Sequence, residues 1–230
     1  MNPQAIGFPK TLRAVLFDLD GTLVDTADEF VPAVQQLRAE HDLEPMEPER
    51  IRENVSNGAR ALVELGLEIS VDAPEFEARR QRLLSLYAEV LGSLASLYPG
   101  IQGLLNRLDA MGIAWGIATN KPRPYTEPLL ARLNIQPAPG SVVCPEDVVD
   151  RKPHPESLYK NCRDLGCAPH QAVYVGDRER DIAAGKAAGM FTIAAGYGYI
   201  EPHDSANHWG ANSCVMHSTD LESLIFSHLE

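Results

Sequence analysis

The stretch from residue 12 to residue 21 constrains the fold of this chain more than any other part of its sequence. An apolar run at residues 14–17 (AVLF) leads directly into Asp18, Asp20 and Gly21. Such a run is typical of a strand buried on both faces of a parallel sheet, and we predict a strand over residues 12–17. Successive side chains of a strand point to opposite faces, so the chain must leave strand geometry for both carboxylates to reach one site. Gly21 permits that turn.

Overall composition narrows the possible partners. The chain has 230 residues, of which 44% are hydrophobic, and a formal net charge of −12. This length suits one large domain or two modest ones with a real core. The negative charge argues against nucleic acid or an anionic membrane surface as a partner. The apolar runs are also too short to cross a membrane.

Cysteine usage and the first residues favour the cytoplasm. The four cysteines form no Cys-x-x-Cys pair, so reduced thiols are expected rather than structural zinc or disulfides. Residues 1–5 (MNPQA) lack the basic region and apolar core of a secretory signal. We therefore predict a cytoplasmic protein whose first residues form a frayed lead into the first strand.

Residues 28–95 contain helical apolar patterns and no convincing strand. Phe30, Val34 and Leu37 recur at helical spacing, as do apolar residues between 83 and 91. Because this block follows the first strand, we predict that it is a helical cap inserted into a catalytic core. The core would comprise residues 1–27 and 96–230. A helical subdomain that only thickens the core is the alternative.

Helices and strands alternate after the predicted cap. The patterns predict helices over residues 101–111, 125–133, 155–165 and 180–188, and strands over residues 113–118, 142–144, 172–175 and 191–194. Such alternation predicts an α/β fold with a Rossmann-like, doubly wound parallel sheet and helices on both faces. Ligands of these sheets bind beyond the carboxyl ends of the strands.

Further polar residues are expected at that edge of the sheet. Thr119 and Asn120 follow a predicted strand and can bind phosphate oxygens. Lys152 lies in a loop stiffened by two prolines and can neutralise anionic charge. Asp177 and Asp181 are four residues apart at a helix start and share one face. Each segment alone suits an ordinary turn, a solvated surface or a helix start, but together they predict one site with the first two aspartates.

Four converging aspartates need a compensating charge. Like charges a few ångströms apart repel strongly. Mg²⁺ prefers hard oxygen ligands and keeps several waters, so it fits carboxylates shared with a substrate's oxygens. With Lys152, the ion would create the local positive charge that a phosphate-bearing substrate needs in an acidic protein.

The motifs, in this order around a helical insertion, resemble the haloacid dehalogenase (HAD) superfamily of phosphatases. The matching segments are DLDGT at 18–22, TN at 119–120, KP at 152–153 and GDRERD at 176–181. They are individually short but jointly specific. The resemblance covers nearly the whole chain.

The resemblance implies a Mg²⁺-dependent phosphoric monoester hydrolase. Asp18 would be the nucleophile that forms an aspartyl-phosphate, and Asp20 would protonate the leaving alcohol and then activate water. Lys152 would steady the nucleophile and the phosphoryl oxygens. The implied catalytic residues are Asp18, Asp20, Thr119, the Asn120 backbone and Lys152. The implied metal ligands are Asp18, the Asp20 carbonyl, Asp177 and, directly or one shell further out, Asp181.

Other activities within this superfamily can be weighed from single residues. A dehalogenase does not need Asp20, so this residue argues for phosphate esters. A phosphonatase needs a cap lysine for its Schiff base, and residues 28–95 contain no lysine. A sugar-phosphate mutase of the β-phosphoglucomutase type shares the whole catalytic set and stays open. A non-catalytic binding module would not need Asp20 and Lys152 together.

The C-terminal part narrows the substrate. Residues 195–199 (AGYGY) resemble phosphoglycolate phosphatases. The continuation to Trp209 and residues 55–61 (VSNGARA) are more similar to the branch that acts on N-acetylmuramic acid 6-phosphate in bacterial cell-wall recycling. We expect the latter substrate, with 2-phosphoglycolate as the alternative, and a monomer or homodimer. Trp209 is expected to anchor its loop.

Both substrates carry a carboxylate as well as a phosphate. Arg60, next to Asn57 and Gly58, is either its bidentate partner or a surface arginine of the cap. Weaker candidates of the same kind are Arg123 and Tyr125. His203 and His208 fit a surface loop better than a metal site.

Arg178 departs from the usual pattern beside a metal-binding aspartate. An arginine at this position must point away from the ion, or pair with Glu179, Asp181 or the substrate.

Overall fold

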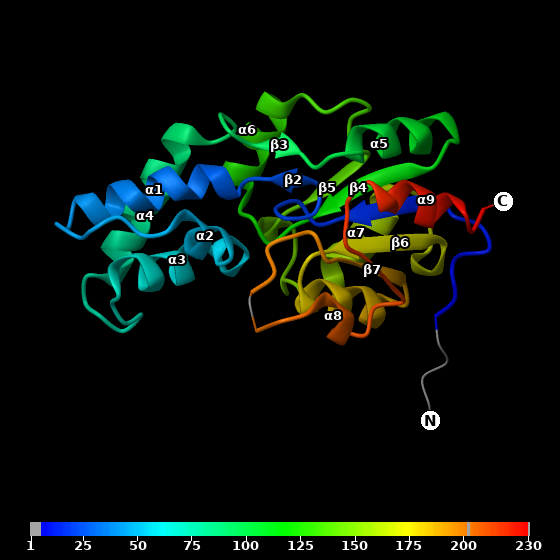
Figure 1. Cartoon of the computed structure of the whole chain (residues 1–230). Helices are drawn as coiled ribbons and strands as arrows, with labels where there is room; N and C mark the ends of the chain where they lie inside the picture. The colour runs from blue at the N-terminus through cyan, green and yellow to red at the C-terminus, as the bar shows by residue number, and fades with distance from the viewer. Residues whose placement is uncertain (1–5, 202, 230) are drawn as a thin grey trace.

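A computed structural model of the chain describes residues 6–201 and 203–229. The expected lead at residues 1–5 lies outside the described residues. Figure 1 shows a sheet with its helices at one end of the molecule and a group of helices at the other.

The core is a six-stranded sheet in which all neighbouring strands run parallel, in the order β5-β4-β1-β6-β7-β8. Its strands are β1 (Ala14–Phe17), β4 (Ala114–Ala118), β5 (Ser141–Val143), β6 (Ala172–Gly176), β7 (Phe191–Ala195) and β8 (Ser213–Val215). The first strand lies between β4 and β6 and is completely buried. The predicted α/β fold class is confirmed.

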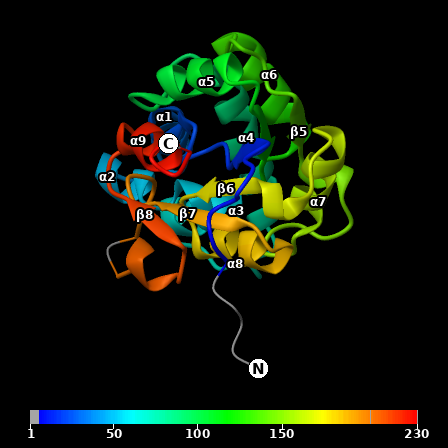
Figure 2. The ribbon, with the colours of Figure 1, turned by 90° about the vertical axis from the view of Figure 1, so that its right-hand side faces the viewer.

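Helices cover both faces of the sheet. Figure 2 shows α5 above the sheet and α8 below it; α9 packs on α5, and α7 packs on α8. The helices that accompany the sheet are α5 (Ile101–Ala110), α6 (Arg123–Leu133), α7 (Glu156–Asp164), α8 (Glu179–Ala188) and α9 (Asp220–Phe226). Gly189 ends α8 in the left-handed conformation, as its position after the helix predicts.

Four α-helices lie between residues 26 and 95 and pack on one another. They are α1 (Ala27–Ala39), α2 (Pro48–Arg52), α3 (Gly58–Leu67) and α4 (Phe76–Val90). Phe30, Val34 and Leu37 of α1 are buried, as their helical spacing predicts. The chain enters and leaves this group through a short antiparallel ladder of β2 (Val24–Asp25) and β3 (Ser96–Leu97), which the sequence did not predict.

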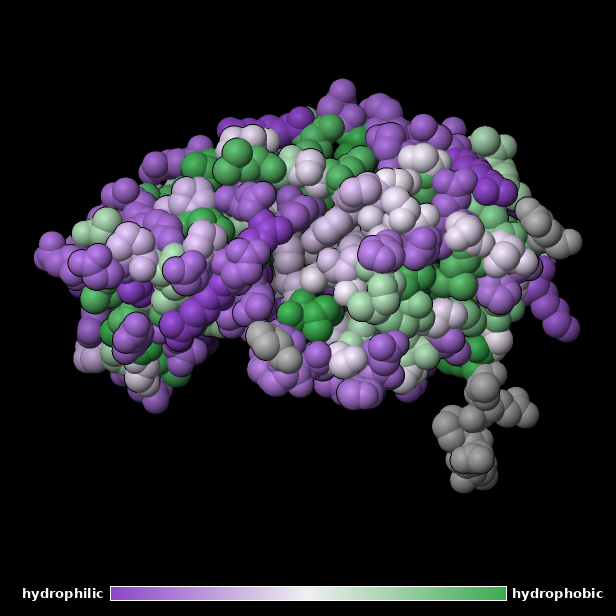
Figure 3. Space-filling view, viewed as in Figure 1, coloured by the Kyte–Doolittle hydropathy of each residue, from purple (hydrophilic) through white to green (hydrophobic). Residues whose placement is uncertain are grey.

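The visible face of the molecule carries both hydrophilic and apolar side chains. In Figure 3 the visible face over α1–α4 is mostly hydrophilic, and apolar side chains form small separate groups. Among the residues that the structure describes, no helix combines the length and hydrophobicity needed to cross a bilayer.

Candidate active site

Three neighbouring strands deliver the polar residues to one edge of the sheet. The first strand ends at Phe17, β4 ends at Ala118 and β6 ends at Gly176. Asp18, Thr119 and Asp177 therefore follow directly at the carboxyl edge, where ligands of parallel sheets bind. The structure thus brings the three segments together at the ends of neighbouring strands.

Three carboxylates gather below this edge. Asp18, Asp177 and Asp181 are buried, and each offers an oxygen within 4.8 Å of the others. Burial, partly offset by Lys152, raises the pKa of Asp18 from 3.8 to about 6. Burial together with the charges of Asp18 and Asp181 raises the pKa of Asp177 from 3.8 to about 7. The three carboxylates therefore disfavour one another's negative charge, and a nearby cation favours the ionised forms.

Lys152 is the buried cation beside this cluster. Its Nζ lies 2.9 Å from Asp18 Oδ1 and 2.7 Å from Asp181 Oδ1. It also donates hydrogen bonds to the Ala118 carbonyl at 2.8 Å and to the Tyr174 hydroxyl at 3.0 Å. Burial opposes its charge, but the two aspartates outweigh burial and raise the pKa of Lys152.

The remaining oxygens of the cluster suit a hard divalent cation. Asp181 has partners on both oxygens, because Lys152 and Tyr174 hold Oδ1 and the Arg178 backbone N–H holds Oδ2. Asp177 also has partners on both oxygens, which accept longer hydrogen bonds of 3.2–3.3 Å from Thr22, Ser56 and the Tyr199 N–H. Within the part of the chain that the structure describes, Asp18 is held through Oδ1 alone, by Lys152 and by the Leu19 N–H at 2.7 Å. Buried carboxylate oxygens that are close together and not fully neutralised are the donors that Mg²⁺ prefers.

The second aspartate of the first motif has a different environment. Asp20 Oδ1 accepts hydrogen bonds from Thr26 Oγ1 at 2.6 Å and from Lys121 Nζ at 3.0 Å. Lys121 Nζ also donates to the Tyr87 hydroxyl at 2.7 Å. Although burial opposes its charge, Asp20 and Tyr87 raise the pKa of Lys121.

The sequence analysis missed Lys121. Two signals were available in the sequence: Lys121 is one of only five lysines in the chain, and it directly follows the Thr-Asn motif.

The Thr-Asn motif leaves donors available for an anion. Thr119 Oγ1 accepts a hydrogen bond from the Lys121 N–H at 3.0 Å, so its own proton is free to be donated. The Asn120 side chain donates to the Lys152 carbonyl at 3.2 Å. Within the described part of the chain, the Asn120 backbone N–H binds no acceptor.

A cleft of about 360 Å³ opens between the sheet edge and the helical group. Asp18, Asp20 and Thr119 line its floor. The predicted substrate-binding residues also border it, together with aromatic and basic side chains. These wall residues are Asn57, Gly58, Arg60, Phe30, Tyr87, Tyr125, Arg80, Arg151 and Arg180.

Several candidates lie elsewhere. Arg123 does not line this cleft and pairs with Glu127 and Asp147, so the suggestion that it faces the substrate is wrong. Trp209 is buried and donates to Asp204 at 2.9 Å, which confirms its role as an anchor of the loop. The exposed His203 has its Nε2 3.1 Å from Glu201 Oε2.

Arg178 points away from the carboxylate cluster. Its guanidinium contacts Glu201 Oε1 and the Glu53 carbonyl, both at 3.3 Å. Asn57 reaches the same Glu201 oxygen at 2.7 Å. Arg178 therefore joins the core to the loop after α2 rather than pairing with Glu179 through its side chain.

Comparison with known proteins agrees with this geometry. Residues 15–195 match the family model described as haloacid dehalogenase-like hydrolase. The chain belongs to the haloacid dehalogenase-like hydrolases. The predicted family and enzyme class, a phosphoric monoester hydrolase, are confirmed by its relatives.

Two curated HAD relatives and one solved structure illustrate the likeness. N-acetylmuramic acid 6-phosphate phosphatase of Pseudomonas aeruginosa is 44% identical over 91% of this chain and 93% of its own length. A phosphoglycolate phosphatase of Xanthomonas campestris is 38% identical over 91% and 94%, respectively. A crystal structure described as a predicted phosphoglycolate phosphatase from Haemophilus somnus superimposes with a TM-score of 0.81 at 24% identity, covering 93% of this chain and 97% of that one.

Proposed function

We propose that this protein is a cytoplasmic, Mg²⁺-dependent phosphatase that hydrolyses N-acetylmuramic acid 6-phosphate during cell-wall recycling. The observation that carries the proposal is the cleft of about 360 Å³ above Asp18, with aromatic and arginine side chains on its walls. Ligand sites of this size suit molecules much larger than a two-carbon phosphoglycolate. The relative from P. aeruginosa bears the name of this activity. We infer a monomer or homodimer acting on this small metabolite.

The proposed reaction has two steps. In the first, an Asp18 carboxylate oxygen attacks phosphorus while Asp20 gives its proton to the departing sugar oxygen, which leaves an aspartyl-phosphate and a free alcohol. In the second, Asp20 accepts a proton from water while the water oxygen attacks phosphorus. The bond between phosphorus and the Asp18 oxygen breaks, which releases inorganic phosphate and regenerates the Asp18 carboxylate. Thr119 and the Asn120 N–H would hold phosphoryl oxygens, and Lys152 would keep Asp18 oriented.

The carboxylate cluster would hold the metal ion. Asp18, the Asp20 carbonyl and Asp177 are the proposed ligands, and Asp181 would act mainly by holding Lys152. When bound, Mg²⁺ supplies positive charge that neutralises the phosphoryl oxygens.

Magnesium is expected to stabilise the protein more at pH 8 than at pH 5. In the metal-free protein the pKa values of Asp18 and Asp177, about 6 and 7, lie above their ordinary 3.8. Their contribution to stability is therefore complete below about pH 4 and is lost as the pH rises through 6 to 7. At pH 5 protons compete with the ion, whereas at pH 8 both carboxylates are free to bind it. Thermal melts with and without Mg²⁺ at both pH values measure how much the ion raises the melting temperature. An equal rise at pH 5 and pH 8 would contradict the assignment of Asp18 and Asp177 as metal ligands.

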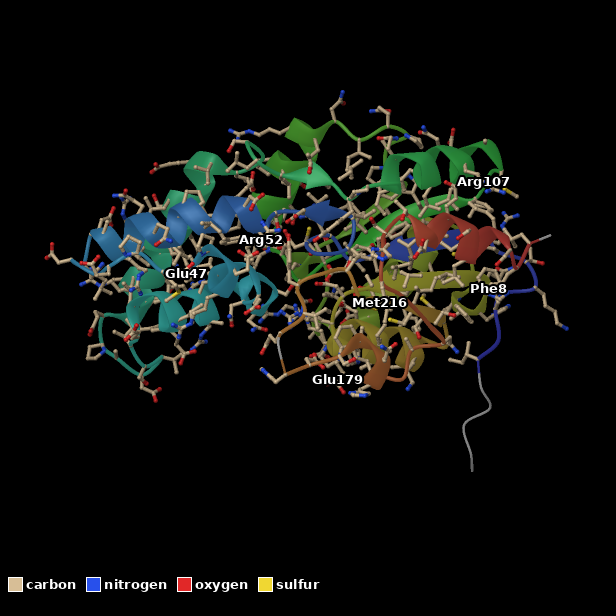
Figure 4. All side chains as sticks on the ribbon, in the orientation of Figure 1. Phe8, Glu47, Arg52, Arg107, Glu179 and Met216 are labelled. Atoms are coloured by element: carbon tan, nitrogen blue, oxygen red, sulfur yellow. The ribbon has the colours of Figure 1, made fainter. Side chains whose placement is uncertain are left out.

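Residues 28–95 are proposed to be a cap that closes over the core of residues 1–27 and 96–230. The two crossings between them pair as β2 and β3, which gives a short, defined hinge. Figure 4 shows Arg52 of α2 at this junction, where it pairs with Asp25 of β2 at 3.0 Å. Closure would exclude bulk water from the cleft.

Arg60 is proposed to bind the substrate carboxylate. Arg80 is held by two hydrogen bonds to Glu77, and Arg180 donates to the Ser56 carbonyl at 2.7 Å. Arg60 is exposed at the cleft wall, with its guanidinium 5.9 Å from the Phe76 ring. Arg60→Ala is expected to raise KM for N-acetylmuramic acid 6-phosphate about tenfold, a loss of about 1.4 kcal/mol, with little change in kcat. Steady-state kinetics test this prediction. KM for p-nitrophenyl phosphate, which has no carboxylate, should be unaffected.

Phosphate release with Mg²⁺ from the muramic acid ester and from 2-phosphoglycolate, at matched concentrations, tests the substrate. A clear preference for the former supports the proposal, whereas a preference for the latter replaces it with the alternative substrate. An isomerised sugar phosphate without phosphate release would identify a mutase. No Mg²⁺-dependent turnover of any phosphomonoester would favour a binding module.

A further inference from the structure

We propose that Lys121, held in place by Tyr87 of α4, is the positioning residue that orients Asp20 for proton transfer. This inference rests on the proposed phosphatase reaction and assigns roles to two residues that the reaction as described above does not use.

Both hydrogen bonds to the Asp20 side chain fall on the same oxygen. Thr26 Oγ1 and Lys121 Nζ donate to Oδ1 at 2.6 Å and 3.0 Å. Among the described residues, no donor binds Oδ2. Because a carboxyl group carries its proton on one oxygen, Oδ2 is the oxygen left to deliver a proton to the departing alcohol and to accept one from water.

Lys121 itself is fixed by residues from the helical group. Its side chain is only 7% exposed, and its ammonium donates to the hydroxyl of Tyr87 at 2.7 Å. The ring of Tyr87 stacks on that of Phe30 of α1, with centroids 4.0 Å apart and planes 7° apart. The ammonium also lies 5.7 Å from the Phe30 ring centroid.

This arrangement connects the cap to the chemistry. Lys121 extends from the core, whereas Tyr87 and Phe30 belong to the helices proposed to form the cap. If the cap moves away, the ammonium loses its hydroxyl partner and its buried surroundings, and Asp20 loses a fixed donor. Asp20, which acts as both acid and base, is then correctly oriented only while the cap covers the cleft. Proton transfer is therefore confined to the closed enzyme.

The test compares Tyr87→Phe and Lys121→Met with wild type on two kinds of ester. The first is an alkyl phosphate, namely the muramic acid ester or 2-phosphoglycolate, depending on which of them the wild type hydrolyses. With this ester, kcat should fall about tenfold for Tyr87→Phe and about a hundredfold for Lys121→Met. KM should change less than twofold. With p-nitrophenyl phosphate, whose leaving group needs no proton, the rapid first release of nitrophenolate should keep its wild-type rate. Lys121→Arg should not restore kcat, because a planar guanidinium does not replace the compact ammonium.

The controls are Tyr159→Phe and Lys160→Met, which remove a hydroxyl and an ammonium from the surface of α7. They should match wild type on both esters. Equal kcat values for wild type and both cleft variants would overturn the inference, and so would an equal slowing of nitrophenolate and alcohol release, which indicates general structural damage. If wild type itself hydrolyses neither alkyl ester nor p-nitrophenyl phosphate, the proposed function fails instead.

Discussion

Replacing Asp18 by Asn is expected to abolish phosphate release while the protein stays folded. The amide keeps the size of the side chain but cannot attack phosphorus, so turnover should fall at least about 10³-fold. The substitution also removes one of three negative charges that lie together. This relief of repulsion limits the loss of folding stability that follows from breaking the ion pair between Asp18 and Lys152. Phosphate release and thermal unfolding of the same preparation measure the two effects. Asp109→Asn, on the exposed face of α5, is the matched control. A folded Asp18→Asn protein with most of its activity would exclude the covalent mechanism.

Lys152→Met is expected to have the largest effect on stability. Methionine fills a similar volume but leaves Asp18 and Asp181 buried without their cation, and breaking a buried pair in this way costs about 3–5 kcal/mol of unfolding free energy. Urea unfolding at pH 7 without metal measures the loss. Activity should also fall, because Asp18 loses the ammonium at 2.9 Å that orients it.

Lys160→Met is the control for this prediction. Lys160 pairs with Asp164 on the surface of α7, and its loss should change the unfolding free energy by no more than about 0.5 kcal/mol. A Lys152→Met protein as stable as this control would mean that the buried ion pairs do not hold the site together.

The sheet could be predicted because most of its strands are continuous apolar runs. The strands β1, β4, β6 and β7 were found with ends shifted by one or two residues, the usual uncertainty at element ends. The strands that were missed lack such a signal. The ladder β2–β3 has two residues in each strand, and β8 is a three-residue edge strand that is only partly buried.

The candidate site was predictable wherever its residues follow strand ends. Asp18, Thr119 and Asp177 meet because three parallel strands end side by side. The contact between Lys121 and Tyr87 was missed because it depends on how α4 packs over the core, which no local pattern encodes. The partners of Arg178 were missed for the same reason, since Glu201 and Glu53 reach it from distant segments.

The role of Asp18 as the nucleophile is tested most directly by locating the phosphoryl group on the enzyme. Asp20→Asn should slow the attack of water on the aspartyl-phosphate, because the base that activates the water is missing. After brief reaction of this variant with p-nitrophenyl phosphate and Mg²⁺, acid quenching and peptide mass mapping should find one phosphoryl group on the peptide that contains Asp18. A phosphoryl group on another residue, or single-turnover phosphate release with no phosphorylated peptide, would show that Asp18 is not the nucleophile.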